Sequence, residues 1–71
     1  MPRKLMYYKE AREKAGIKFQ AEMARRMGMQ KASYSLKENY DQQFKADELM
    51  VFCDITGVDQ KDLYILGYNY K

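Results

Sequence analysis

Residues 20–39, QAEMARRMGMQKASYSLKEN, contain two short amphipathic segments on either side of a glycine. One face of the first segment carries Met23, Ala24 and Met27. Gly28 follows where the chain must turn sharply, because glycine alone adopts positive φ without a Cβ clash. The second segment runs over about residues 31–39, and Tyr34 is its large inward-facing apolar residue. The stretch therefore predicts two helices joined by a tight glycine turn.

A helix, a short glycine turn and a second helix form the pattern of a helix-turn-helix, which places its second helix in the DNA major groove. Short helix pairs joined at a glycine also occur in small helical domains that have no nucleic-acid role. The pattern by itself leaves both interpretations open.

The distribution of charge adds to this pattern. The net charge is only +3, but residues 1–40 hold ten Lys or Arg and four Asp or Glu, which is +6, while residues 41–71 hold three and six, which is −3. A basic half that carries the helix pair, followed by an acidic half, favours a protein that docks one face on phosphates. The alternative is an ordinary solvated surface, and Arg25 and Arg26 on the second helix are interpreted in that way.

The length and composition predict one small domain, residues 1–71, of ordinary apolar content. The longest apolar run, residues 49–53, is too short to span a bilayer, and the first residues lack the apolar segment of a signal peptide. A single cysteine forms no internal disulfide, which fits a reducing compartment. We expect a cytoplasmic domain that is not associated with a membrane.

Several observations argue against an enzyme. The chain has no histidine, which is the commonest general base and metal ligand. Cys53 lies on the apolar stripe of a predicted helix, where a buried structural thiol is expected rather than a nucleophile. No glycine loop that would cradle a phosphate is present. We therefore expect no catalytic residues, no metal, no cofactor and no small-molecule ligand.

Apolar periodicity predicts three further helices around the central pair. The first covers about residues 3–15 and ends at Gly16, after which Phe19 is expected to pack on Met23. The fourth is capped by Asp47 and ends at Gly57, with Phe44 as a core residue before it. The fifth follows Asp59 and Asp62, and its apolar residues are Leu63, Ile65 and Leu66. No segment is typical of a strand, so the predicted fold class is all-α with five short helices.

The spacing of particular residues resembles the Cro and phage-repressor type of helix-turn-helix family over about residues 5–66. The residues that carry this resemblance are Gln20, Ala21, Glu22, Ala24, Gly28, Tyr34, Ser35, Glu38 and Asn39. The resemblance implies a five-helix domain with the helix-turn-helix at about residues 20–39. It also implies a sequence-specific, phage-like transcriptional regulator that acts as a repressor by occupying operator DNA.

The family also implies an ion pair between Arg12 of the first helix and Glu38 at the end of the recognition helix. The chain departs from the family at two places. Three residues, rather than two, separate Gly16 from Gln20. Tyr40 stands where the family has a glycine, and we expect Asn39 to adopt the left-handed conformation there.

The resemblance and the exposed face of the recognition helix together predict the DNA contacts. Base contacts are expected, near the start of that helix, from Lys31, Ala32, Ser35 and Leu36. Phosphate contacts, which give salt-dependent affinity without sequence information, are expected from Lys18, Lys37, Asn39 and Lys45, and from the backbone N–H groups at Gln20, where the second helix begins.

One such helix pair reads only a few base pairs, so a homodimer on double-stranded DNA is expected. The predicted dimer contact comprises Leu63, Tyr64, Leu66 and Tyr68, although these residues are equally expected to close the core of the monomer. The alternative function is a protein-interaction module, an antitoxin or antirepressor, that binds a partner protein with the same fold. The exposed Leu36, Tyr40 in place of glycine and the longer loop before Gln20 keep this alternative open.

Overall fold

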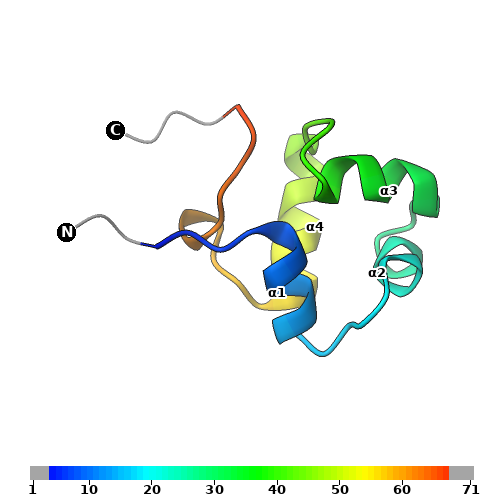
Figure 1. Cartoon of the computed structure of the whole chain (residues 1–71), viewed down its shortest axis with the longest axis horizontal. Helices are drawn as coiled ribbons and strands as arrows, with labels where there is room; N and C mark the ends of the chain where they lie inside the picture. The colour runs from blue at the N-terminus through cyan, green and yellow to red at the C-terminus, as the bar shows by residue number, and fades with distance from the viewer. Residues whose placement is uncertain (1–3, 68–71) are drawn as a thin grey trace.

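Short helices and tight turns make up most of residues 4–67, the part of the chain that the structure, a computed structural model, describes. The elements in chain order are α1 (Tyr8–Lys14), α2 (Gln20–Arg26), α3 (Lys31–Glu38), α4 (Ala46–Thr56) and the 3-10 helix η1 (Gln60–Asp62). Figure 1 shows α2 and α3 at one end of the long axis and the two terminal segments at the other. Over the described residues the chain is all-α, and its only β pairing there is an isolated parallel bridge between Met6 and Leu63.

Each helix turns one apolar stripe toward a common core. The buried apolar residues are Tyr8, Ala11, Ile17, Met23, Ala24, Tyr34, Leu49, Phe52 and Leu63. Tyr8 and Ala11 in α1, and Leu49 and Phe52 in α4, are three residues apart, a spacing that places both side chains on one face of their helix. Phe44, predicted to be a core residue, is half-buried and packs edge-on against Tyr8, with ring centroids 4.8 Å apart.

The first helix begins later than the sequence predicts. It starts at Tyr8 rather than near residue 3, because the backbone of Met6 is hydrogen-bonded to the far end of the chain. The Met6 N–H donates to the Asp62 carbonyl at 2.8 Å, and the Met6 carbonyl accepts from the Tyr64 N–H at 2.9 Å. Backbone groups paired in this way are not available for a helical turn.

The predicted fifth α-helix is not confirmed within the described residues. The chain forms only the single turn of η1, and Leu63 continues in an extended conformation, with φ −99° and ψ 143°. Asp59 does cap this turn, since its carboxylate accepts from the Lys61 N–H at 3.1 Å. The pairing of residues 62–64 with Met6 replaces the helix, because both ladder bonds require an extended backbone.

Two predictions about helix starts need correction. Phe19 is exposed and does not cover the buried Met23; Ile17, from the same loop, enters the core instead. Lys45, and not Asp47, is the N-cap residue of α4. Asp47 lies within the first turn, where its carboxylate accepts from the Glu48 N–H at 2.9 Å. The Glu48 carboxylate accepts from the Lys45 N–H at 2.9 Å, which satisfies one of the free backbone donors at that helix end.

The left-handed residue after α3 is Tyr40 and not Asn39. Tyr40 has φ 67°, whereas Asn39 has φ −83°. A residue with a Cβ adopts this conformation at a cost of about 1–2 kcal/mol, so contacts of the Tyr40 side chain must offset it. Gly28, by contrast, adopts φ 70° between α2 and α3 without that cost, as the sequence predicts.

Candidate nucleic-acid interface

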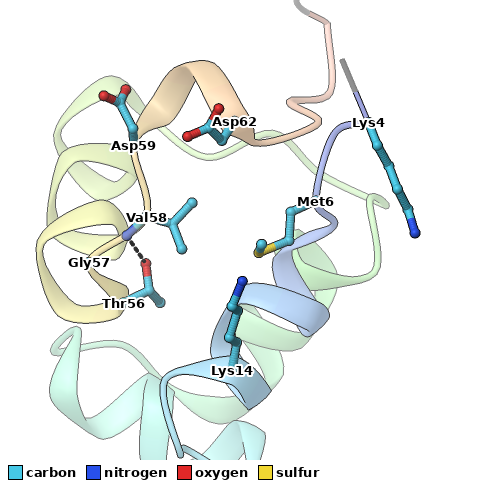
Figure 2. A pocket seen from close by; sticks show the side chains of 8 residues that line it. All are labelled: Lys4, Met6, Lys14, Thr56, Gly57, Val58, Asp59 and Asp62. Carbon is cyan, nitrogen blue, oxygen red and sulfur yellow. Dashed lines mark hydrogen bonds between the residues drawn. The ribbon is translucent and has the colours of Figure 1, made fainter. Parts of the chain in front are cut away.

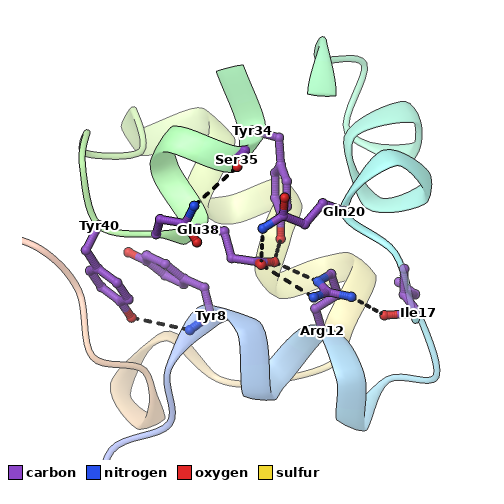
Figure 3. A network of polar contacts seen from close by, with 9 residues as sticks. Tyr8, Arg12, Ile17, Gln20, Tyr34, Ser35, Glu38 and Tyr40 are labelled. Carbon is purple, nitrogen blue, oxygen red and sulfur yellow. Dashed lines mark hydrogen bonds and ion pairs between the residues drawn. The ribbon is translucent and has the colours of Figure 1, made fainter. Parts of the chain in front are cut away.

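A buried polar cluster joins α1, α2 and α3 (Figure 3). The Arg12 guanidinium donates from Nε to Glu38 Oε1 at 2.7 Å, and its Nη2 lies 3.4 Å from Glu38 Oε2. Its Nη1 donates to the Ile17 carbonyl at 2.8 Å. The structure thus contains the ion pair that the family resemblance implies, with both side chains almost wholly buried.

Two further side chains complete the hydrogen bonds of the Glu38 carboxylate. Gln20 Nε2 donates to Oε2 at 2.6 Å, and the Tyr34 hydroxyl donates to Oε1 at 2.7 Å. Every fully buried side-chain nitrogen or oxygen of the described residues has a partner. A buried ion pair that is satisfied in this way holds its helices in one arrangement, whereas removal of one partner leaves a buried charge without compensation.

The pKa values of this cluster follow from the same contacts. Burial acts to raise the pKa of Glu38, but the hydrogen bonds from its three donors outweigh burial, so the pKa lies below its usual value. Burial and the hydrogen bond to Glu38 together raise the pKa of the Tyr34 hydroxyl well above its usual value. The carboxylate is therefore charged, and the phenol neutral, across the physiological pH range.

This cluster fixes which side of α3 faces outward. Tyr34 is fully buried, whereas Lys31, Ala32 and Leu36 are exposed, with 40% of Leu36 accessible to solvent. Ala32 and Leu36 lie on the side of α3 away from Tyr34, and Lys31 is accessible because it is the first residue of the helix. The fourth predicted base-contacting residue, Ser35, is half-buried, and its hydroxyl accepts from Asn39 Nδ2 at 3.2 Å.

Four of the five predicted phosphate-contacting residues fall into two groups. Lys18 and Lys45 are exposed, and neither side chain forms an ion pair with a described residue. The side-chain amides of Gln20 and Asn39 are bonded to Glu38 and Ser35. A phosphate contact from either side-chain amide would have to replace an existing hydrogen bond. The contact expected from the backbone N–H of Gln20, at the start of α2, does not involve that amide and stays a prediction.

Lys37 does not occupy the position that the prediction requires. It is buried, and its Nζ donates to Glu48 Oε1 at 2.5 Å, which ties α3 to α4. Burial acts to raise the pKa of Glu48, but the hydrogen bonds from Lys37 and from the Lys45 N–H hold it below its usual value. Lys37 is therefore a structural residue here. The prediction that Lys37 contacts a phosphate is wrong for this structure.

An aromatic joint connects the end of α3 to both terminal segments. The Tyr40 ring stacks on Tyr8 with centroids 4.7 Å apart and planes 10° from parallel. The Tyr40 hydroxyl donates to the Tyr64 carbonyl at 2.6 Å and accepts from the Tyr8 N–H, the first backbone donor of α1, at 3.3 Å. These contacts explain why the chain places a tyrosine in the left-handed conformation that a glycine would adopt more easily.

The predicted dimer contact is also revised. Leu63 is fully buried in the core of the monomer, so its assignment to a dimer surface is wrong. Tyr64 is partly exposed and Leu66 half-buried, while Tyr68 lies outside the described residues. Tyr7, which the prediction omitted, is 60% exposed and its ring centroid lies 5.7 Å from that of Tyr64.

Away from α2 and α3, a surface pocket of about 490 Å³ is formed by the N-terminal segment, α1, the end of α4 and η1 (Figure 2). Its lining includes two lysines, Lys4 and Lys14, and two aspartates, Asp59 and Asp62, together with the apolar side chains of Met6 and Val58. None of the predicted DNA-contacting residues lines this pocket.

Three further observations concern metal ions, the cysteine and the bilayer. Among residues 4–67 no three His, Cys, Asp or Glu side chains gather in a metal-binding group. Burial and the nearby Asp59 and Asp54 raise the pKa of the half-buried Cys53 thiol, which disfavours the reactive thiolate. Among the helices of the described chain, none has both the length and the apolar character required to cross a bilayer.

Sequence reasoning missed three side-chain hydrogen bonds that involve α3. Tyr34 and Glu38 are four residues apart on one helix, a spacing at which side chains meet, so their hydrogen bond was open to prediction. The bonds from Gln20 to Glu38 and from Lys37 to Glu48 join separate helices, and no local pattern in the sequence signals them.

Comparison of the chain with protein-family models, with curated proteins and with solved structures finds no match.

Proposed function

We propose that this protein is a sequence-specific DNA-binding regulator of transcription, of the phage-repressor helix-turn-helix kind, with α3 as its recognition helix. The observation that carries the proposal is the orientation of α3. Its Tyr34 side is locked into the core by the Arg12–Glu38 cluster, its opposite side leaves Ala32 and Leu36 accessible, and Lys31 is exposed at the start of the helix. A helix held rigidly on one side and bare on the other is what a major-groove reader requires.

The chemistry of the accessible residues supports base reading. A lysine donates to O6 and N7 of guanine, and the methyl groups of alanine and leucine contact the methyl group of thymine. Repression follows from site occupancy, because a protein seated in the groove competes sterically with polymerase for the same DNA.

The structure reduces the number of available phosphate contacts. Lys18 and Lys45 keep accessible ammonium groups, whereas Lys37 is bound to Glu48. About two cations per subunit, Lys18 and Lys45, then neutralise phosphates, which gives a slope of log K against log salt near −2 per subunit. Titration of binding to duplex DNA with salt measures this slope, and absence of binding at low salt would refute the proposal.

Two lysine variants separate base contacts from phosphate contacts. Lys31→Ala is expected to relax sequence preference at about one base position, because it removes a base donor. Lys18→Ala is expected to weaken binding to all sequences alike and to reduce the salt slope by about one. Identical behaviour of the two variants in a competition assay with random DNA would contradict the division of roles.

We propose that the protein acts as a homodimer that joins two half-sites, with the exposed rings of Tyr7 and Tyr64 in the contact. Two subunits are required because a single short helix reads too few base pairs for specificity. The alternative function, a module that binds a partner protein, is favoured by one observation: Leu36 exposes 40% of its surface in the middle of the face assigned to DNA. A flat salt response would favour that alternative.

A further inference from the structure

The outer face of α4 is apolar and acidic, whereas the proposed DNA face carries lysines. Met50 and Val51, both apolar, are 65% and 40% exposed. Asp47 precedes this pair by three residues and Asp54 follows it by three, and both are exposed. In a helix of 3.6 residues per turn, positions i, i+3, i+4 and i+7 lie along one stripe. We call these four residues the α4 stripe.

The α4 stripe is an accessible surface, although the Asp47 carboxylate also accepts a hydrogen bond from the Glu48 N–H at 2.9 Å. The inward side of α4 is occupied by Leu49 and Phe52, which are buried in the core. The third carboxylate of the helix, Glu48, is bonded to Lys37 and to the Lys45 N–H, whereas Asp47 and Asp54 form no ion pair with a described residue. No Lys or Arg occurs between Ala46 and Thr56. The stripe therefore consists of an apolar pair bracketed by two uncompensated negative charges.

This arrangement restricts what can bind. Nucleic acid is excluded, because the aspartates repel phosphates. A second copy of the chain is disfavoured, because a two-fold contact presents the same patch from both subunits and would bring four carboxylates together without a cation. A complementary ligand offers apolar side chains for Met50 and Val51 and positive charge at both ends.

We propose that the α4 stripe docks a helical segment of a partner protein in which two adjacent apolar residues are bracketed by Lys or Arg. The two aspartates are seven residues apart, which is about 10.5 Å along the helix axis. A partner helix with the pattern Lys-X-X-Leu-Leu-X-X-Lys matches both the apolar pair and the two charges at this spacing. The surface offered by four side chains is small, so the complex is transient and of micromolar or weaker affinity.

The test uses the full chain and two synthetic helical peptides. One carries Lys-X-X-Leu-Leu-X-X-Lys, and the matched control carries Glu in place of both lysines. Two-dimensional amide NMR spectra are recorded while each peptide is added, because weak binding is visible as shifts of individual signals. We expect the lysine peptide to shift signals of residues 46–55, and the glutamate peptide to shift none of them.

Two variants identify the contacts. Met50→Ser is expected to weaken binding of the lysine peptide about tenfold, because it removes the main apolar contact. Asp54→Lys is expected to weaken it about fivefold and to permit binding of the glutamate peptide. Both positions are exposed, so both variants should keep the fold, which their own spectra verify.

Three outcomes would overturn the proposal: no shifts on α4 with the lysine peptide, equal binding of both peptides, or concentration-dependent shifts of the stripe in the protein alone, which indicate self-association. None of these outcomes depends on DNA. If the peptide does not bind the α4 stripe, the proposed DNA-binding function is therefore unaffected. If the protein does not bind DNA, the proposal for the α4 stripe is likewise unaffected.

Discussion

At the scale of single residues, Glu38 organises the molecule. Its carboxylate receives hydrogen bonds from Arg12 of α1, Gln20 of α2 and Tyr34 of its own helix. One side chain thereby fixes three helices, and it does so with bonds that are strong because the site is dry and charged. The orientation of the candidate recognition helix depends on this one residue more than on any other polar group.

Arg12→Ala should destabilise the protein strongly. The substitution leaves the Glu38 carboxylate buried without its cation, which costs about 3–5 kcal/mol. Chemical denaturation followed by circular dichroism measures the change in the free energy of unfolding. Arg26→Ala is the matched control, because Arg26 pairs with Glu22 on the surface, where the two side chains are 52% and 33% exposed. Loss of that exposed pair should change stability by less than about 1 kcal/mol, and equal losses in the two variants would contradict the role of the buried cluster.

Stability should also depend on pH through Glu38. Its pKa in the folded protein is lowered, so its contribution is present above the ordinary carboxyl value of 4.5 and is lost as pH falls through the folded-state pKa. In Glu38→Gln this contribution is absent at every pH, and Arg12 is left without its anion. The variant is expected to be less stable than the wild type at neutral pH, and the difference should narrow below about pH 4.

Denaturation curves of both proteins, measured from about pH 7 down to about pH 3, test this expectation. The pKa of Glu48 is also lowered, but Glu48 is present in both proteins, so its contribution cancels in the comparison. A difference in stability that stays constant with pH would show that Glu38 does not titrate as proposed.

At the scale of elements, the joint at Tyr40 decides how α3 connects to the rest of the chain. Its hydroxyl links the first backbone donor of α1 to the carbonyl of Tyr64, and its ring lies flat on Tyr8. The end of the recognition helix is thus attached to both terminal segments. Lys37 and Glu48 form a second attachment one turn earlier, between α3 and α4.

Two substitutions separate the backbone cost of Tyr40 from its side-chain contacts. Tyr40→Phe removes only the hydroxyl and is expected to cost about 1 kcal/mol. Tyr40→Gly relieves a left-handed strain of about 1–2 kcal/mol but also loses the stacking, the hydrogen bond and the buried ring surface. A net loss of about 1–3 kcal/mol is expected from thermal or chemical unfolding. If Tyr40→Gly were more stable than the wild type, the left-handed strain would cost more free energy than the side-chain contacts of Tyr40 contribute.

At the scale of the whole molecule, the chain presents two faces of opposite charge. The exposed side of α3 and its flanking lysines are basic, and the outer side of α4 is acidic and apolar. A domain of 71 residues buries only about 60% of the surface of its unfolded chain and gains from association. The exposed aromatic rings of Tyr7 and Tyr64 offer a surface for association with a second subunit.

Tyr7→Glu should shift the protein from dimer to monomer. The added charge would be buried in the proposed contact, while the exposed position of Tyr7 leaves the monomer fold intact. Sedimentation analysis over a range of concentrations measures the change. Phe19→Glu, at another exposed aromatic far from Tyr64 in sequence, is the control and should leave the mass unchanged. A wild-type protein that is monomeric at all concentrations would contradict the proposed homodimer.

The sequence by itself determined the central helices, the glycine turn between them and the burial of Tyr34. Helical periodicity and the permissive backbone of glycine are local properties, so residues 20–39 fold as their own pattern requires. The ion pair between Arg12 and Glu38 could be predicted only from the family resemblance. Its partners lie 26 residues apart, and no local rule brings them together.

Only the tertiary structure decided the extended segments at Met6 and Leu63, the inward turn of Lys37 and the left-handed conformation of Tyr40. Each of these features depends on a partner that the chain brings close from elsewhere: Asp62 and Tyr64 for Met6, Glu48 for Lys37, and Tyr8 with Tyr64 for Tyr40. Propensity near each site favoured a different outcome. The contacts prevailed because satisfied hydrogen bonds and a stacked ring together outweigh these local preferences, which are a few tenths of a kcal/mol for most residues and about 1–2 kcal/mol for the left-handed Tyr40.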